Sequence, residues 1–288
     1  MKQNLMFIAG LCAASALTSP AAAQEAADSS SASGSETSVY DGDWLSVGVG
    51  MGYGPSYDGS DDYVAFPIPV VQGSLGGIGI SPRGGGLALD FLADPKKGVG
   101  FDFGPAVQLR SNRASKIEDK VVRSLGKLDR AVEIGPSMGI TVAQVFHEYD
   151  TLTFSTDIGW DVAGAHKGMV VSPALTYFTP LSRGAAVSLT ASAEWGDRKF
   201  ADYYYSISPA QSAVSGLAPF SAGKGFTKAG LTAIGGIDLD GNLLNGGFAI
   251  VVGGGYSRML GDAKDTPLTS VRGSPNQWFG AIGIGYTF

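Results

Sequence analysis

Few side chains in this sequence have the type and spacing that catalysis requires. Two histidines, His147 and His166, could act as general bases, but neither belongs to a nucleophile motif such as Gly-x-Ser-x-Gly. They fall in connectors at opposite rims of the predicted wall of strands, so they cannot share a site. The only cysteine, Cys12, lies in an N-terminal segment that we expect to be removed. The sequence therefore predicts no enzyme activity, no metal and no cofactor.

One acidic loop could bind a cation. Asp58, Asp61 and Asp62 stand close to Ser60, and carboxylate oxygens are suitable ligands for a divalent ion. The alternative is structural, because Asp and Ser side chains often hydrogen-bond their own backbone around a tight turn. We favour the structural interpretation.

A second polar group lies near the C-terminus, where Asp262, Asp265 and Arg272 share one long connector. These side chains could pair across the base of the connector or with the first loop, which would be its neighbour in a closed barrel. They could instead form a ligand site. We favour pairing that fixes the loops over the mouth of a barrel.

Basic residues gather with helix-like spacing in another connector. Their charges could meet lipopolysaccharide phosphates outside the cell, and a solvated loop of mixed charge is the simpler alternative. The set comprises Lys116, Lys120, Arg123, Lys127 and Arg130, with Glu118, Asp119 and Asp129 among them.

A further polar set follows the period of a β-strand. In residues 151–162, apolar side chains alternate with Thr, Ser, Gly and Asp, so one face is apolar and the other is acidic and rich in hydroxyls. In a transmembrane barrel the polar face lines the lumen. The predicted lumen-facing polar residues are Asp102, Gln108, Arg110, Glu133, Asp157, Asp161 and Glu194.

The strands that would position these residues are clearest at the C-terminus. Residues 278–288 place bulky apolar side chains on one face and small ones on the other, with no charge on either. Such a strand is typical of a wall between lipid and a lumen, although an edge strand of a soluble sandwich is the alternative. Its terminal aromatic suggests the signal read by the barrel-assembly machinery, formed by Trp278, Ile282, Ile284, Tyr286 and Phe288.

Similar alternation recurs along the chain and predicts an antiparallel up-and-down β-barrel of about twelve strands, with ten or fourteen as alternatives. Long and short connectors alternate, which predicts that both termini are periplasmic. The predicted strands are 45–53, 63–72, 75–81, 86–92, 99–110, 132–142, 151–162, 168–178, 185–195, 225–239, 244–256 and 278–288.

The N-terminal residues indicate the compartment. Residues 1–23 have a basic start, an apolar run and a small-residue cleavage site near Ala23, as in a secretory signal peptide. Residues 24–40 predict a disordered periplasmic leader, and the barrel occupies residues 41–288. With 20 basic and 26 acidic residues, the net charge of −6 argues against nucleic acid as a partner. We expect the outer membrane of a Gram-negative cell.

Several loops resemble the MipA/OmpV family, whose members are known as MltA-interacting proteins. The resemblance spans residues 41–288 and rests on the segments that begin at Tyr57, Ser208, Gly261 and Arg272. Its residues are Tyr57, Gly59, Ser60, Asp61, Asp62, Tyr63, Ser208, Pro209, Gln211, Ser215, Gly216, Gly261, Asp262, Asp265, Pro267, Arg272, Gly273, Asn276 and Gln277.

This resemblance implies an outer-membrane barrel that acts as a scaffold. It would bring together a lytic transglycosylase, which cuts murein, and a penicillin-binding protein, which builds it. Two alternatives rest on the residues themselves: a narrow channel for small solutes, suggested by the polar lumen, and a surface adhesin, suggested by the long loops.

Overall fold

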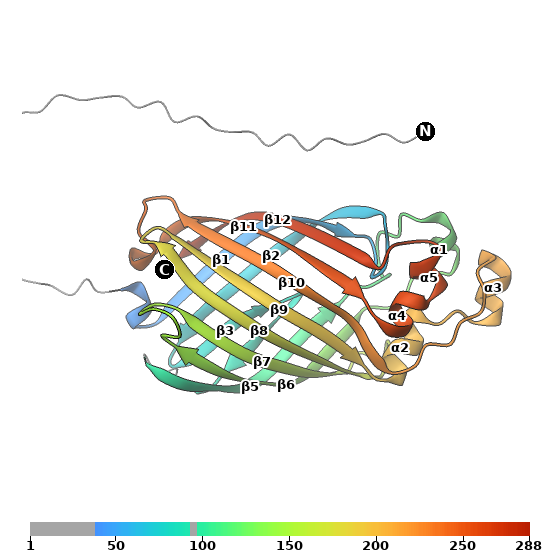
Figure 1. The fold of residues 1–288 in the computed structure, drawn as a ribbon, viewed down its shortest axis with the longest axis horizontal. Coiled ribbons are helices and arrows are strands. Elements are labelled where there is room, and N and C mark those ends of the chain that lie inside the picture. The colour runs from blue at the N-terminus through green and yellow to red at the C-terminus, as the bar shows by residue number, and fades with distance from the viewer. Residues whose placement is uncertain (1–37, 93–96) are drawn as a thin grey trace, which may run out of the picture. The chain divides into compact units, whose positions relative to one another are not determined.

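A closed barrel of twelve antiparallel strands forms the body of the computed structural model, which describes residues 38–92 and 97–288 (Figure 1). The predicted signal peptide, most of the predicted leader and part of one turn lie outside the described residues. Each strand pairs with its neighbours in sequence, and β1 closes on β12, so the predicted strand number is confirmed. The strands are β1 (Trp44–Pro55), β2 (Tyr63–Leu75), β3 (Ile78–Arg83), β4 (Gly86–Asp90), β5 (Gly98–Arg110), β6 (Ala131–Ala143), β7 (Thr151–Asp161), β8 (Met169–Ser182), β9 (Ala185–Gly196), β10 (Gly225–Asp238), β11 (Gly247–Met259) and β12 (Asn276–Thr287).

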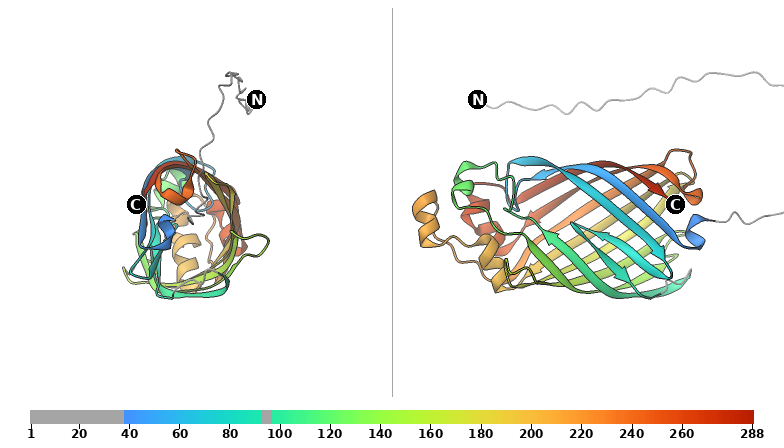
Figure 2. Two further views of the ribbon diagram at one scale, coloured as in Figure 1. Left: turned by 90° about the vertical axis from the view of Figure 1, so that its left-hand side faces the viewer. Right: turned by 180° about the vertical axis from the view of Figure 1, so that it is seen from behind.

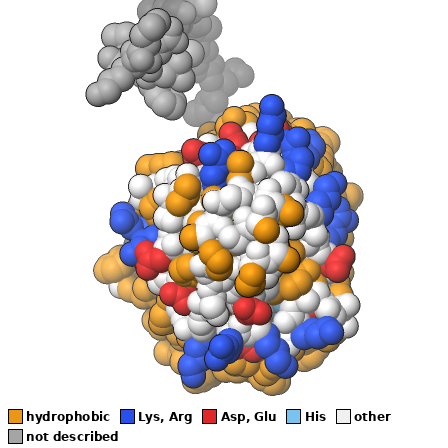
Figure 3. Space-filling model, turned by 90° about the vertical axis from the view of Figure 1, so that its right-hand side faces the viewer, with side chains coloured by type: hydrophobic (Ala, Val, Ile, Leu, Met, Phe, Trp, Pro, Cys, Tyr) orange, Lys and Arg blue, Asp and Glu red, His pale blue; other side chains and the backbone are white. Residues whose placement is uncertain are grey.

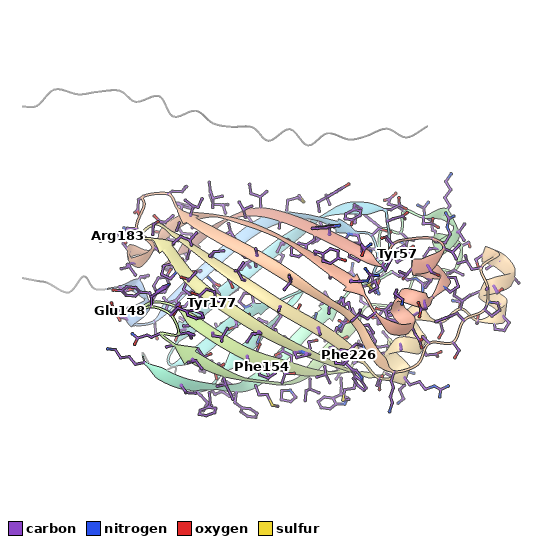
Figure 4. The ribbon with its side chains drawn as sticks, in the orientation of Figure 1. Tyr57, Glu148, Phe154, Tyr177, Arg183 and Phe226 are labelled. Atoms are coloured by element: carbon purple, nitrogen blue, oxygen red, sulfur yellow. The ribbon has the colours of Figure 1, made fainter. Side chains whose placement is uncertain are left out.

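The alternation in sequence becomes the two faces of this wall. Val49 in β1 pairs with Ile284 in β12, both on the outward face, while the intervening glycines face the lumen. Val49 is 62% exposed and Ile282 is 60% exposed. Large apolar side chains project outward along the length of the wall (Figure 4). An apolar surface this extensive is stable only in contact with hydrocarbon or another apolar partner.

The second and third strands differ from the prediction. The strand expected at residues 75–81 is wrong in position, because β2 continues to Leu75 and β3 begins at Ile78. Gly76 and Gly77 form the turn between them with φ of 59° and 79°, a conformation that glycine adopts without strain.

Pro67 and Pro69 are nevertheless accommodated inside β2. This strand pairs with β1 along its whole length, but with β3 only through residues 73–75. One side of β2 therefore has no paired strand at the two prolines. Proline lacks an N–H to donate and is tolerated at such an edge.

The eleventh strand also begins later than predicted. Leu243–Asn245 form a 3-10 turn, η2, and β11 begins at Gly247. The side chain of Asn242 caps this turn by accepting a hydrogen bond from the N–H of Leu244. The hydrogen bond that caps the turn thus outweighs the apolar pattern that predicted a strand from residue 244.

The two ends of the barrel differ in their connectors. One end, which we call the turn end, has the shorter connectors, the 3-10 turn η1 (Val39–Asp41) and the C-terminus. The other, which we call the helical end, has the long connectors and all the α-helices of the described residues (Figure 1). None of the helices in these residues is long and apolar enough to cross a membrane.

The helices close the helical end of the bore. They are α1 (Lys120–Ser124), α2 (Arg198–Tyr205), α3 (Pro209–Ser215), α4 (Gly261–Asp265) and α5 (Pro267–Ser270). Seen from the turn end, helices lie behind the opening of the barrel (Figure 2). We call these helices and their connectors, residues 111–130, 197–224 and 260–275, the plug.

Two apolar clusters hold the plug together. Phe200, Tyr204 and Tyr205 of α2 pack against Met259 and Ala263 in the first cluster. Tyr57, Val122, Ile207 and Leu268 belong to the second, which joins four separate connectors. Both clusters are buried, so the plug has a core of its own within the mouth of the barrel.

Candidate functional site

An ion-pair network crosses the lumen directly beneath the plug, and Arg110 at the end of β5 is its centre. The Nε of Arg110 donates to Oε1 of Glu133 at 2.7 Å, and its Nη2 donates to Oε2 of the same residue at 3.2 Å. Its Nη1 donates to Oε2 of Glu194 at 2.8 Å. All three side chains are buried, and they come from β5, β6 and β9. The network therefore links strands on different sides of the bore.

Further side chains extend the network. Nε2 of His166 lies 3.1 Å from Oε1 of Glu133. Nζ of Lys228 lies 3.6 Å from Glu194 and 3.5 Å from Asp58. These contacts join the connector between β7 and β8 and the first loop to the same cluster. The buried charges of Arg110, Glu133 and Glu194 must be paired, because an isolated charge loses its hydration.

Neutral polar groups satisfy the remaining lone pairs. Oγ1 of Thr227 donates to Oε1 of Glu194 at 2.7 Å. Asn112 accepts a hydrogen bond from the backbone N–H of Asp58 at 3.0 Å and donates one to its carboxylate at 3.2 Å. The first loop is thus fixed to the connector after β5.

Helix α2 rests on this network through Phe200. The guanidinium carbon of Arg110 lies 4.9 Å from the centroid of the Phe200 ring, and the His166 ring meets the same ring edge-on at 5.2 Å. Asp197 caps the helix by accepting from the N–H of Phe200 at 2.9 Å. A Cβ at Gly196 would overlap the Phe200 ring, so glycine is required where β9 passes into α2. The plug and the network are therefore one structural unit.

Some polar groups inside the plug have no partner. Arg113 is 2% exposed, and its Nη1 donates to the carbonyl of Tyr204 at 3.4 Å. Within residues 38–92 and 97–288, nothing bonds its Nε and Nη2 or the hydroxyls of Tyr204 and Tyr205. Burial lowers the pKa of Arg113 and raises that of both tyrosines.

The first and last loops meet as predicted for neighbours in a closed barrel. The hydroxyl of Tyr57 donates to the carbonyls of Leu268 and Arg272 at 3.2 and 3.3 Å. Ser60 and Gly273 form a β-bridge, and a Cβ at Gly273 would overlap the carbonyl oxygen of Gly59. The junction is therefore made by backbone and by the neutral side chains of Tyr57 and Gln277, the latter donating to the carbonyl of Ser60 at 3.0 Å, rather than by ions.

The ion pairing expected across the base of the last loop or with the first loop is wrong in its partners. Arg272 pairs with Asp119 at the start of α1, with its Nε 3.1 Å from Oδ2. Asp262 accepts from the N–H of Gly223 at 2.7 Å, and Asp265 lies 3.2 Å from its neighbour Lys264. Arg272 and Asp262 thus reach other connectors, whereas Asp265 stays within α4, because the plug folds three connectors together.

Other predicted lumen residues lie outside the network. Asp157 pairs with Arg83 at 2.6 Å, and Asp102 accepts from the hydroxyl of Thr141 at 3.2 Å. The amide of Gln108 donates to the carbonyl of Gly84 at 2.9 Å, while Asp161 accepts from the N–H groups of Ala163 and Lys167 at the end of β7.

The side chains of the acidic first loop bond both within the loop and to other elements. Asp58 belongs to the network, and the hydroxyl of Ser60 accepts from the N–H of Asp62 at 3.0 Å. Among the residues that the structure describes, no three His, Cys, Asp or Glu side chains are grouped to hold a metal ion.

The segment that begins at Ser208 is helix α3 with both of its caps. Ser208 and Gln211 form a reciprocal capping box, and Pro209 occupies the first turn. Gly216 ends the helix with φ of 73°, the left-handed conformation that favours glycine. These motif residues therefore shape the plug.

The two histidines lie at opposite ends of the barrel. Nε2 of His147 lies 2.7 Å from the Thr179 hydroxyl at the turn end, whereas His166 is buried in the network. Sequence reasoning missed His166, Lys228, Asp58 and Phe200 as members of the network. Lys228 carried a signal, because it is a charged residue on the inward face of its strand.

Comparison with known protein families finds one family that matches most of the chain. The family model described as "MltA-interacting protein MipA" matches residues 47–288. The chain belongs to the MipA family. With its closed barrel, it is an outer-membrane β-barrel protein of that family. A search of curated proteins gave no match.

Solved structures with similar folds are distant. The COG4313 outer membrane channel from Pseudomonas putida F1 is 12% identical, with a TM-score of 0.45, over 86% of this chain and 96% of that one. OccK11 (OpdR) from Pseudomonas aeruginosa is 10% identical, with a TM-score of 0.28, over 88% and 97% of the two chains. These scores are too low to bear on the function of this MipA-family protein.

Proposed function

We propose that this protein is a scaffold for murein-remodelling enzymes, with its turn end in the periplasm and its helical end outside the cell. On this proposal, the turn end binds a lytic transglycosylase of the MltA type and brings it to a penicillin-binding protein. The observation that carries the proposal is the match of residues 47–288 to the MltA-interacting protein family. The alternation of short and long connectors supports the orientation.

The plug favours a scaffold over a channel. A passive channel needs a continuous aqueous path, whereas helices with two apolar clusters and a buried ion network occupy the helical end of this bore. Conductance in planar bilayers tests the alternative, because a steady open pore in the unmodified protein would replace the scaffold with a channel.

The turn end offers exposed apolar side chains for docking. Phe146 is 78% exposed, Leu181 69% and Tyr149 67%, and Glu148 and Arg183 lie at the same end (Figure 4). Exposed aromatic residues with flanking charges are common in protein interfaces. The short turns present a limited area each, so a partner would contact several of them at once.

Site-specific photo-crosslinking in cells tests this docking. A photoreactive residue in place of Tyr149 should capture a lytic transglycosylase, which mass spectrometry would identify, together with a penicillin-binding protein bound to it. Val214 in α3 is the matched control, because it is 66% exposed but lies at the helical end. Capture of neither enzyme from Tyr149 and Leu181, or equal capture from Val214, would refute the scaffold.

We also propose that the protein has no catalytic role. The two histidines lie at opposite ends, and the buried polar residues beneath the plug pair with one another. Murein hydrolysis by the purified protein alone would contradict this.

A further inference from the structure

A row of threonines crosses the lumen face of five consecutive strands, β6 to β10. Each threonine is the direct partner of the next across the sheet, and the row runs Thr141, Thr153, Thr176, Thr190 and Thr232. Sequence neighbours such as Phe154 and Leu189 are exposed on the outward face, so the threonines face the lumen. Neighbouring strands lie about 4.8 Å apart, which makes this threonine row roughly 19 Å long.

The hydroxyls of the threonine row keep hydrogen-bonding capacity for a further partner. Thr141 donates to Oδ2 of Asp102 at 3.2 Å, so the 2.9 Å bond between Thr141 and Thr153 uses the proton of Thr153. The hydroxyls of Thr176 and Thr190 lie 3.0 Å apart. A hydroxyl has one proton and two lone pairs, so both pairs keep lone pairs and the second pair also keeps a proton. The row can therefore both donate to a ligand and accept from it.

An aromatic ring continues the row beyond its last threonine. Thr232 pairs with Gly255, and Gly255 pairs with Phe279 of β12. The Phe279 ring lies over this glycine, because a Cβ there would be 2.5 Å from the ring and 3.0 Å from Oγ1 of Thr232. Phe66 of β2 lies beside Phe279, since both side chains approach Gly54. Phe279 is 37% exposed and Phe66 is 39% exposed, although both face the lumen. The row thus ends at two exposed aromatic rings.

The lumen leads to this row from the turn end. Inward side chains are exposed at successive depths, from Gln72 near the turn end of β2 to Ile234 and Ser192 farther along the wall. At the opposite end, side chains of the plug cover the mouth of the barrel (Figure 3). The row rises between the two ends, because Thr141 is two residues from the turn end of β6 and Phe279 is three residues from the helical end of β12.

The chemistry of the row and its rings matches a saccharide. A pyranose ring has hydroxyls around its edge and an apolar face of C–H bonds, so it binds through hydroxyl partners together with an aromatic surface. Small-molecule sites usually combine aromatic surface with a few polar groups in fixed positions. The spacing of the threonines, about 4.8 Å, is close to the length of one sugar in an extended β-1,4-linked chain.

We propose that the lumen binds the end of an extended, β-1,4-linked saccharide chain that enters from the turn end. Its hydroxyls exchange hydrogen bonds with the threonine row and with Asp102, and its terminal ring packs on Phe279. The choice of murein glycan as the source of this chain rests on the scaffold function and the orientation proposed above. The part of the chain outside the lumen then stays within reach of the enzymes docked at the turn end.

Calorimetric titration of the refolded full chain with chitotetraose tests the site, in a detergent without a sugar headgroup. Maltotetraose, which is α-linked and coiled, is the comparison sugar. Thr190→Val removes one hydroxyl of the row at nearly constant volume, and Phe279→Ala removes the ring. The matched controls are Thr156→Val and Phe154→Ala, because both side chains lie on the outward face of β7. Heat-dependent mobility on gels reports whether each barrel is folded.

We expect the unmodified protein to bind chitotetraose. Thr190→Val should weaken this binding about fivefold, as for the loss of one hydrogen bond, and Phe279→Ala should weaken it about tenfold. The two outward controls should bind as the unmodified protein does, and maltotetraose should bind about tenfold more weakly than chitotetraose because its coil does not follow a straight row. Thr190→Val preserves shape, so it keeps the test valid if Phe279→Ala does not fold.

Absence of chitotetraose binding to the folded protein would overturn the site, as would equal losses in the lumen variants and their outward controls. Equal affinity for maltotetraose would overturn the assignment to an extended glycan. The titration contains no enzyme, so it is independent of the crosslinking from Tyr149 that tests the scaffold. Capture of the enzymes without chitotetraose binding would reject this site alone, whereas chitotetraose binding without capture would reject the scaffold alone.

Discussion

Removing Arg110 should open the plug while leaving the barrel intact. Arg110→Ala would leave Glu133 and Glu194 buried without the guanidinium that donates three hydrogen bonds to them. It would also remove the cation from the ring of Phe200, on which α2 rests. The strands would keep their own backbone pairing, so the change should be confined to the plug.

The magnitude follows from the burial of the pair. Breaking a buried ion pair by removal of one partner costs about 3–5 kcal/mol. Lys228 would still lie 3.6 Å from Glu194, so we expect the lower end of this range. A loss of about 3 kcal/mol raises the ratio of open to closed plug roughly 150-fold.

Two assays read this opening. Arg198 and Lys199 lie in the first turn of α2, so the rate of tryptic cleavage after them measures how often the helix unfolds. Planar-bilayer conductance measures whether the open plug leaves a continuous pore. We expect both to rise in Arg110→Ala, while barrel melting changes little.

Arg83→Ala is the matched control. Arg83 also pairs with an acid inside the lumen, Asp157, but the two side chains are 26% and 20% exposed and neither contacts the plug network. This variant should leave tryptic cleavage and conductance unchanged. If Arg110→Ala behaves like Arg83→Ala, the network does not hold the plug and our reasoning is wrong.

Three further predictions concern other parts of the barrel. Burial alone would raise the pKa of Asp119, but hydrogen bonds from Arg272 and from the N–H of Val122 lower it below the ordinary value of 3.8. The contact between Asp119 and Arg272 therefore stabilises the plug above pH 3.8, and this stabilisation is lost as the pH falls through the lowered pKa. Hydrogen exchange in α1 should accelerate over that pH range in the unmodified protein and not in Asp119→Asn. Gly273→Ala should destabilise the loop junction by about 1–3 kcal/mol through overlap with the Gly59 carbonyl, measured as faster tryptic cleavage, and an unchanged rate would contradict the overlap. Deletion of Phe288 should lower the yield of folded barrel in outer membranes at unchanged synthesis, and a normal yield would argue against the assembly signal.

The sequence alone determined the wall. Alternation has a period of two residues in any strand, so side chains such as Val49 and Ile284 revealed their common face before any pairing was known. The lengths of the connectors predicted that short turns lie at one end of the barrel and long loops at the other. The strand number and the difference between the two ends followed from these local signals.

Strand ends were less predictable, because local polar contacts compete with alternation. Asn242 caps η2, and the glycine pair at 76–77 places a turn where the pattern suggested a strand. Proline cannot donate to a strand ladder, yet Pro67 and Pro69 are tolerated in β2 because β3 is too short to pair with that part of it. Such outcomes depend on which neighbour a strand meets.

Only the tertiary structure decided what fills the lumen. Arg110, Glu133 and Glu194 were each recognised as inward-facing, but their association depends on the strand register that brings β5 and β9 within reach across the bore. His166 and Phe200 come from connectors, whose conformation follows no fixed period. Alternation tells which way a side chain points, whereas its partner depends on distances that arise only when the barrel closes.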